Sequence, residues 1–316
     1  MPSVLITGAS GCVGHYVVDE FAAAGYEAYL LVRNPAKLRF DPATRPNVTV
    51  VRGDLTELSA HAALLSQMDY CVHTAAAWGG PAAWEVNVRR THELFTLLNP
   101  ERVRRIVYFS TASILGRGNR LLHEVDRYGT DYIRSKYRAY VELPQSPNYE
   151  RIVTVFPTLV FGGDRGHPTS HLSSGLPLLK RWAWLLGRLD TDAWFHFIHA
   201  RDIARLVRHL VEAEQVEKDN VLGNEPLSFG EFTRRVAAYF GHRIGWQLHL
   251  SPQAMYRFAR LMGARMSPWD RFCIEYGDFR YRTVNCPAVG LPGDLSTLEG
   301  ILADWERAQR EAVVEP

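Results

Sequence analysis

The sequence predicts an α/β fold in which a doubly wound parallel sheet carries a smaller C-terminal lobe. Two observations support this prediction. Short β-branched runs alternate with helical patterns through the first half of the chain, and the alternation weakens after about residue 160, where glycine, proline and tryptophan become more frequent. Strands that alternate with helices form parallel sheets with right-handed crossovers, and helices then cover both faces.

Six buried strands are expected in the first half, each a short apolar run of the kind found in parallel sheets. They are residues 3–7, 28–32, 48–53, 70–75, 105–110 and 151–156. Helices are expected over 13–25, 83–98 and 131–143, and the first two end at Gly25 and Asn99-Pro100. The second half is expected to contribute helices over 171–189, 251–266 and 296–312, the last with Ser296 as its cap.

Composition limits the classes of function. A chain of 316 residues with a formal net charge of +2 has no electrostatic signature of a nucleic-acid partner. The four cysteines form no CxxC pair and the N-terminus lacks a signal-peptide pattern, so we expect a cytoplasmic protein without disulfides. Lys180 and Arg181 interrupt the most apolar stretch, 176–189, which therefore cannot span a bilayer. An amphipathic surface helix or a flap is expected there, and Trp182 and Trp184 leave contact with a membrane surface open.

A glycine-rich turn, "TGASGCVG", follows the first strand and opens the first helix. In this context the first glycine allows a tight turn, the second lets a pyrophosphate approach the backbone, and the third lets the helix lie close to the strand. The free amides of the helix N-terminus bind the phosphates. We therefore expect a Rossmann domain that binds a dinucleotide through Gly8, Ser10, Gly11, Cys12, Val13 and Gly14.

The end of the second strand indicates which dinucleotide binds. An acid there accepts a hydrogen bond from the ribose 2′-hydroxyl of NAD, but Val32 occupies this position and Arg33 follows it. Arg33, with help from Lys37, can pair with a 2′-phosphate. We expect a preference for NADP(H), with NAD(H) still possible. After the third strand, Asp54 and Leu55 are expected to hold the adenine.

A lysine on the inner face of the helix 131–143 is the most unusual feature of the sequence. The apolar stripe of that helix is Tyr132, Lys136, Ala139, Tyr140 and Leu143. A buried ammonium loses its hydration unless something compensates for it. Lys136 can lower the pKa of the neighbouring Tyr132, which makes the tyrosine a better acid–base, and can hold the ribose of a nicotinamide.

Hydroxyl side chains end the fifth strand, where open α/β sheets bind their ligands. They are Ser110, Thr111 and Ser113 in "FSTASILG". Together with the glycine turn and the Tyr132/Lys136 pair, they provide a hydroxyl to hold a substrate oxygen, an acid–base and a cofactor-binding cation. A hydrolase is not indicated, because Ser110 lacks the GxSxG context of a nucleophile elbow.

The chain resembles the extended short-chain dehydrogenases/reductases, the group that contains nucleotide-sugar epimerases and dehydratases and the dihydroflavonol-reductase-like enzymes. The resemblance covers roughly the whole chain and rests on "TGASGCVG", "GDL", "VHTAAA", Asn87 in "VNVRRT", "FSTASILG", "YIRSK", "FPTLVFG" and "FIHARDIA". It implies Thr111 as the catalytic hydroxyl, Tyr132 as the acid–base and Lys136 as its modulator. It also implies that Ala75 and Ala76 pass behind the cofactor ribose, that Pro157 begins a loop near the nicotinamide, and that His199 is not catalytic.

Three departures from the family pattern matter. Phe156 stands where relatives often carry arginine, and Asp131 stands where proline is frequent; we expect Asp131 to face solvent. Ala112 and Ser113 replace the Asp–Glu pair that dehydratases place after the catalytic threonine, which argues against dehydration of nucleotide sugars.

Some features have more than one explanation. The pairs His167/His171 and His196/His199 are expected to pack or lie on the surface, and no metal site is expected. Helices that begin near residues 84 and 129 carry extra apolar residues, Ile133, Tyr137 and Val141 among them, which either form a homodimer interface or pack within the subunit. Many aromatic residues of the second half either bind an apolar ligand or belong to the core.

Three functional hypotheses follow. The first is an NADP(H)-dependent reductase or dehydrogenase acting on a small, apolar or aromatic substrate. The second is a nucleotide-sugar epimerase with tightly bound NAD, and the third is a non-catalytic NADP-sensing scaffold. In the first, residues 1–160 bind the cofactor and 161–316 mainly the substrate, while 194–213 returns to pack on the cofactor domain.

Overall fold

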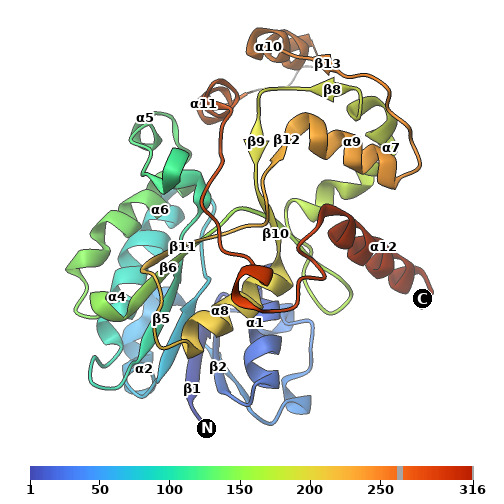
Figure 1. The fold of residues 1–316 in the computed structure, drawn as a ribbon. Coiled ribbons are helices and arrows are strands. Elements are labelled where there is room, and N and C mark those ends of the chain that lie inside the picture. Colours follow the sequence, from blue (N-terminus) through green and yellow to red (C-terminus); the bar gives the residue numbers. More distant parts are fainter. Residues whose placement is uncertain (262–265, 315–316) are drawn as a thin grey trace.

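The computed structural model describes residues 1–261 and 266–314 and is built around a seven-stranded parallel sheet (Figure 1). The strand order is β11-β6-β5-β4-β1-β2-β3, so the sheet is doubly wound, as predicted. Its strands are β1 Ser3–Thr7, β2 Glu27–Val32, β3 Val48–Arg52, β4 Tyr70–His73, β5 Arg105–Phe109, β6 Ile152–Pro157 and β11 Asp219–Leu222. The direction of winding reverses between β1 and β4, and ligands of such sheets bind at the carboxyl ends of the strands beside this point.

All six strands expected from the sequence are present, and their ends differ from the predicted ones by at most two residues. The seventh strand, β11, was not expected. It is four residues long, begins with Asp219 and Asn220, and pairs with β6 from Thr154 to Pro157. So short and partly polar a run has no periodicity of its own, and only its pairing with β6 makes it a strand.

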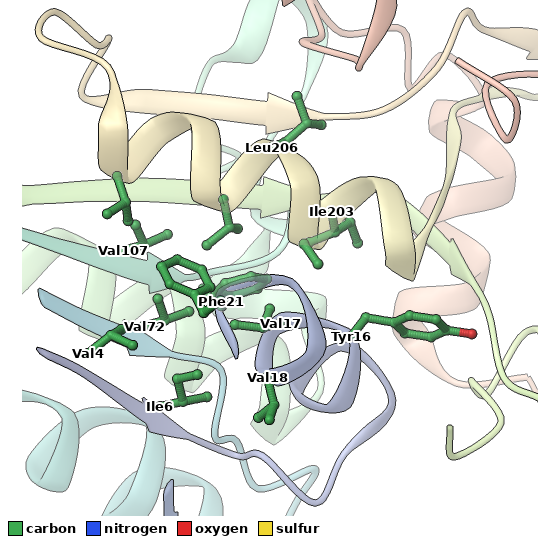
Figure 2. Close-up of a cluster of buried hydrophobic side chains, with 14 of the residues drawn as sticks. Val4, Ile6, Tyr16, Val17, Val18, Phe21, Val72, Val107, Ile203 and Leu206 are labelled. Carbon is green, nitrogen blue, oxygen red and sulfur yellow. The ribbon is translucent and has the colours of Figure 1, made fainter. Parts of the chain in front are cut away.

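One face of the sheet is covered by helix α1 (Cys12–Ala23) and helix α8 (Ala200–Glu212). Side chains of β1 alternate between the two faces: Val4 and Ile6 point into this layer, whereas Leu5 belongs to the opposite one. Figure 2 shows the core between the two helices and the sheet, with Ile203 and Leu206 of α8 above the α1 side chains. Helix α8 comes from the segment that was expected to return to the sheet.

The other face is covered by helical segments that follow β3, β4 and β5. They are α2 (Ala62–Leu65), α3 (Pro81–Trp84), the π-helical segment Glu85–Arg90, α4 (Thr91–Leu97) and α6 (Asp131–Glu142). The helix predicted over 83–98 is therefore continuous in space but contains one π-helical turn. That turn contains Asn87, which is fully buried.

The second half forms a smaller lobe above the carboxyl ends of the strands (Figure 1). It contains three two-stranded pairs, β7 with β10, β9 with β12 and β8 with β13. These strands are β7 Leu159–Phe161, β8 Leu189–Asp190, β9 Trp194–Phe195, β10 Phe197–His199, β12 Leu227–Ser228 and β13 Leu248–His249. The lobe's helices are α7 Leu176–Leu186, α9 Phe229–Tyr239, α10 Pro252–Leu261, α11 Pro268–Tyr276 and α12 Leu298–Val314; the short α5, Val125–Tyr128, lies beside α11.

Several predictions for this half need correction. The helix expected over 171–189 is α7 alone, preceded by a 3₁₀ turn and followed by β8. The described part of the helix expected over 251–266 is α10, Pro252–Leu261; residues 262–265 lie outside the described residues, and Met266 is not helical. Helices α9 and α11 were not expected. The terminal helix begins at Leu298, so its cap is Thr297, whose hydroxyl accepts from the Gly300 amide at 3.1 Å, and not Ser296.

Across residues 1–261 and 266–314, none of the helices has the length and apolar character needed to cross a membrane. The assignment of cofactor binding to residues 1–160 and of substrate binding to 161–316 stays a prediction. The sheet draws β11, and its helical cover α8, from the second half.

Candidate active site

The glycine turn between β1 and α1 is packed so closely that two of its glycines have no space for a Cβ atom. Gly8 has φ +74°, and a Cβ there would lie 2.4 Å from Thr74 Oγ1. A Cβ on Gly14 would lie 2.1 Å from the Gly8 carbonyl oxygen. These two glycines are therefore required by the close approach of the turn to β4 and of the helix to the turn. Ser10, Cys12 and Val13 are half-buried around the same turn.

Gly11 differs from its two neighbours because the protein itself leaves nearly enough room for a side chain there. A Cβ on Gly11 would meet only the Gly8 carbonyl oxygen, at 3.3 Å, and the residue is exposed at the N-cap of α1. A pyrophosphate against the helix N-terminus would need that room, as in dinucleotide-binding turns. The turn therefore fits a dinucleotide cofactor.

The ends of β2 and β3 place two expected cofactor residues next to each other. Arg33 Nε lies 3.7 Å from Asp54 Oδ2, and the Arg33 side chain is 77% exposed. Lys37 is exposed nearby in sequence, and Leu55 is buried in the core under β3. One expectation was wrong: Val32 packs in the core between the sheet and α1, so an acid at 32 would not reach a ribose. The first side chain beyond the strand is Arg33, which also is not an acid.

The loop after β4 is fixed by Asn87. Its Oδ1 accepts from the Ala77 amide and its Nδ2 donates to the Ala77 carbonyl, both at 2.8 Å, and Nδ2 also donates to Ser135 Oγ of α6 at 2.9 Å. This network joins the loop, the π-helical turn and α6. Ala75 and Ala76 lie half-buried in the same loop, and the Cβ position of Gly8 lies 2.6 Å from the Ala75 amide nitrogen. The loop after β4 therefore runs beside the glycine turn.

Two hydroxyls lie at the end of β5. Thr111 Oγ1 donates to Ser113 Oγ at 3.2 Å, and the Thr111 hydroxyl is near enough to Tyr132 of α6 to lower its pKa. Ser110 Oγ is buried and, among the described residues, has no hydrogen-bond partner. A buried hydroxyl without a partner costs free energy, and such groups mark places where a ligand or water is needed.

Lys136 is 1% exposed and confirms the buried lysine predicted on the inner face of α6. Its Nζ donates to the Phe109 carbonyl of β5 at 2.7 Å and lies 5.1 Å from the centre of the Tyr108 ring. Burial lowers the pKa of Lys136 to about 7. The ammonium has three donors, and the Phe109 carbonyl is the acceptor that the structure gives it, so ribose hydroxyls of a cofactor would satisfy the others.

Tyr132 lies half-buried one helical turn before Lys136. Burial raises the pKa of Tyr132 to about 12, while the nearby Thr111 hydroxyl acts in the opposite direction. The expectation that Lys136 lowers this pKa is therefore not met in the protein alone, because the loss of water around the phenol outweighs other effects. Thr111, Tyr132 and Lys136 nevertheless come together between β5 and α6.

Trp78 is a residue of the site that the sequence interpretation missed. Its ring stacks on the Tyr132 ring, with the centroids 4.6 Å apart and the planes at 21°. The sequence did carry a signal, since "WGG" follows the fourth strand at the edge of the sheet where ligands bind.

The structure shows the surroundings of Asp131 and Phe156, two residues that depart from the family pattern. Asp131 is 40% exposed, as expected, but its Oδ1 pairs with Arg134 at 2.9 Å and its Oδ2 accepts from the Gly80 amide at 3.2 Å. Phe156 is buried and packs edge-on against Tyr140. Pro157 is half-buried as the last residue of β6.

The histidines have structural surroundings. His199 is buried, accepts from the Arg201 amide at the start of α8 and lies 3.4 Å from Asp304 Oδ2. His196 is bonded to the Asn224 carbonyl and the Tyr281 amide. Within the described part of the chain, no three His, Cys, Asp or Glu side chains are grouped so that they could hold a metal ion.

Comparisons with known proteins show the family and the fold of the chain. The model of the NAD dependent epimerase/dehydratase family matches residues 4–223, well over half of the chain. A 3 beta-hydroxysteroid dehydrogenase/Delta 5→4-isomerase of Mycobacterium tuberculosis is 27% identical over 301 residues, with 87% of this chain and 77% of that protein covered.

Two solved structures share the fold. The terminal R domain from the myxalamid PKS-NRPS biosynthetic pathway has a TM-score of 0.73 at 16% identity, over 99% of this chain and 91% of that chain. A double mutant of DesIV, the dTDP-glucose 4,6-dehydratase of Streptomyces venezuelae with NAD and DAU bound, has a TM-score of 0.66 at 19% identity over 99% and 98% of the two chains. With the family match, the sheet and the glycine turn lead to one conclusion: the chain belongs to the NAD-dependent epimerase/dehydratase family, a group of NAD(P)-dependent oxidoreductases within the extended short-chain dehydrogenases/reductases.

Proposed function

We propose that the protein is an NADP(H)-dependent reductase or dehydrogenase that interconverts a carbonyl and an alcohol on a small, apolar or aromatic substrate. The observation that carries this proposal is the meeting of Thr111, Tyr132 and the buried Lys136 at the carboxyl ends of the strands. A hydroxyl, a phenol and an ammonium in this arrangement suit the transfer of one proton to or from a substrate oxygen.

In the reduction, Tyr132 donates its phenolic proton to the carbonyl oxygen while the carbonyl carbon gains a hydride. The pKa of Tyr132, raised to about 12 by burial, keeps the phenol protonated until that oxygen becomes basic. Thr111 donates a hydrogen bond to the same oxygen. The products are the alcohol and a tyrosinate, which takes up a proton from solvent; oxidation runs the same steps backwards.

NADP(H), when bound, supplies or accepts the hydride. Lys136 would hold the nicotinamide ribose, and the positive charge of Lys136 would then lie beside Tyr132 and favour its tyrosinate. We assign the pyrophosphate to Gly8, Ser10, Gly11, Cys12, Val13 and Gly14, the adenine to Asp54 and Leu55, and the ribose and nicotinamide surroundings to Ala75, Ala76 and Pro157. The exposed Arg33, with Lys37, would bind a 2′-phosphate.

An apolar substrate is favoured over a nucleotide sugar. Relatives from Mycobacterium tuberculosis and Mycolicibacterium neoaurum are named as dehydrogenases of hydroxysteroids, which are apolar ring alcohols. A diphosphate would need free basic side chains, and two candidates for that role are engaged: Arg280 is held by both oxygens of Asp278, and Arg188 donates to the Trp184 carbonyl. The alternative, an epimerase with tightly bound NAD, keeps the support of nucleotide-sugar enzymes among the similar folds. Membership of an enzyme family leaves no support for the scaffold hypothesis.

We further propose that the protein forms a homodimer through the helices that begin near residues 84 and 129. Ile133 belongs to the subunit's own core, but Val141 on the same helix is 44% exposed and Trp84 is 41% exposed. Large apolar side chains on neighbouring helices are typical of such interfaces.

The first experiment measures nucleotide binding and turnover together. Wild-type protein, freed of any bound nucleotide, is titrated with NADPH and NADH, and its ketone reduction is followed by loss of nicotinamide absorbance. We expect reversible binding with at least about tenfold higher affinity for NADPH than for NADH, because one charge-assisted contact to the 2′-phosphate changes the affinity by about this factor. Tyr132→Phe is expected to bind NADPH like the wild type and to lose at least about a hundredfold in kcat.

Arg33→Ser is the matched cofactor variant, because Arg33 does not contact Tyr132. It is expected to lose the preference for NADPH and to keep kcat with saturating cofactor. NAD that copurifies in equal amount with the protein and resists exchange would favour the epimerase instead. Unchanged turnover in Tyr132→Phe would refute the acid–base assignment.

A further inference from the structure

Trp78 combines high exposure with contact to the proposed acid–base. The residue is 74% exposed, more than Trp246 on the smaller lobe at 65%. One face of its ring lies nearly parallel to the Tyr132 ring. A single exposed apolar side chain is common in proteins, but this one lies against the residue that would transfer a proton to the substrate.

We propose that Trp78 forms the aromatic wall of a substrate subsite, and that this subsite takes a flat, apolar ring system that contains or adjoins the reacting carbon. The inference rests on the proposed role of Tyr132 and adds to it the shape and chemistry of the substrate. A ring held beside Tyr132 can extend over the open surface of the indole, and both would then lose contact with water.

The chemistry of an indole surface selects such a ligand. Offset stacking of rings and the burial of apolar area both favour a flat, apolar group over an acyclic chain of equal size. The charged side chains near the loop are acidic or already paired. Asp131 binds the Gly80 amide and Arg134, and Glu85 is paired with Arg90 at 2.7 Å. An anionic substrate would therefore gain less on this side of the site than an apolar ring.

The loop that carries Trp78 is fixed on both sides of the indole. On one side Ala77 is bonded to Asn87, and on the other the Gly80 amide donates to Asp131. Gly80 has φ +66°, a conformation that favours glycine. Asp131 is thus a positioning residue. The proline frequent at this place in the related family could not accept the Gly80 hydrogen bond, because its side chain has no acceptor.

The test compares two ketones in wild type, Trp78→Ala and Trp78→Phe, with saturating NADPH. The probes are α-tetralone, a flat bicyclic ketone, and an acyclic ketone with the same number of carbons. For Trp78→Ala we expect KM for α-tetralone to rise about tenfold, the size of one aromatic stack, while KM for the acyclic ketone and the Kd of NADPH change less than about twofold. Trp78→Phe should retain most of the affinity for α-tetralone.

Trp246→Ala is the matched control, because it removes an exposed tryptophan far along the chain from the site and should change neither KM. Equal rises in KM for both ketones in Trp78→Ala, or no rise for either, would overturn the proposal. If the wild type binds NADPH but reduces neither ketone, the reaction proposal fails separately. The subsite is then judged by equilibrium binding of α-tetralone to the NADPH complex: weaker binding to Trp78→Ala supports it, and equal binding to both proteins overturns it.

Discussion

At the scale of single residues, Lys136 shows how burial and function oppose each other. Its side chain is buried at the carboxyl end of β5 with the Phe109 carbonyl as acceptor, and no carboxylate of the described residues pairs with it. The cost of burying the ammonium appears as a lowered pKa. We therefore expect Lys136 to lower the stability of the cofactor-free protein, and we expect a bound cofactor to offset this loss.

Lys136→Met should therefore stabilise the cofactor-free protein in a pH-dependent way. The pKa is about 7 in the folded protein, below its ordinary value near 10.5, so between these values the unfolded chain binds the extra proton. The contribution of Lys136 to the free energy of unfolding is therefore lowest below about pH 7, and it rises by up to about 1.4 kcal/mol per pH unit above that value. The gain from Lys136→Met should be largest near pH 6 and shrink towards about pH 9 in urea unfolding.

The readout is the change of that difference with pH, because other effects of the substitution are common to all pH values. A difference between the two proteins that stays constant over this range would mean that Lys136 keeps its ordinary pKa in the fold. Saturating NADPH should reduce the difference, since the cofactor would provide acceptors for the ammonium.

At the scale of elements, the turn between β1 and α1 contains glycines that are needed for two different reasons. Gly8 and Gly14 are required by backbone atoms of the protein, whereas Gly11 is not. The three glycines look alike in the sequence. The positions of β4 and α1 distinguish them, because the clash partners are the Thr74–Ala75 backbone and the turn's own carbonyl.

Gly14→Ala and Gly11→Ala should therefore fail in different ways. Gly14→Ala places a Cβ 2.1 Å from the Gly8 carbonyl oxygen and should lower the free energy of unfolding by about 1–3 kcal/mol. Gly11→Ala should cost about 1 kcal/mol or less as an N-cap change but should weaken NADPH binding at least about tenfold. Thermal unfolding and fluorescence titration with NADPH measure the two effects. If the Gly11→Ala protein binds NADPH like the wild type, the pyrophosphate does not bind at this turn.

At the scale of the whole molecule, His167 connects the smaller lobe to the cofactor-binding layer. Its Nε2 bonds Asp19 of α1 and its Nδ1 bonds Asp164 of the loop after β7, both at 2.7 Å, and its ring stacks on Tyr16 at 3.7 Å. Burial opposes the charged form, but the bonds to Asp164 and Asp19 outweigh it and raise the pKa of His167. A charged histidine between two carboxylates thus links the lobe to α1.

His167→Gln should weaken this link most at low pH. A folded-state pKa above the ordinary value means that the charged His167 stabilises the fold fully below about pH 6.5 and loses this effect as pH rises through the raised value. The loss of unfolding free energy in His167→Gln should accordingly be larger at about pH 6 than at about pH 9. His171→Gln, an exposed neighbour, is the control and should change little at either pH. An equal loss at both pH values would mean that the link does not depend on charge.

The sequence by itself determined the parts of this protein that depend on local pattern. Six strands, the glycine turn with its context, and the buried lysine of α6 were predicted from apolar spacing and turn residues, and the family resemblance was confirmed. Spacing along a strand or a helix reports which face is buried, and this needs no knowledge of the partner.

The tertiary structure alone decided the features that depend on which segments meet. Strand β11 exists because β6 lies beside it, Val32 turns into the core, and Trp78 lies on Tyr132 because Asn87 and Asp131 hold its loop there. The upward shift of the Tyr132 pKa also depends on which segments meet. Burial depends on everything packed around a group, whereas the sequence showed only that a lysine stands one turn away.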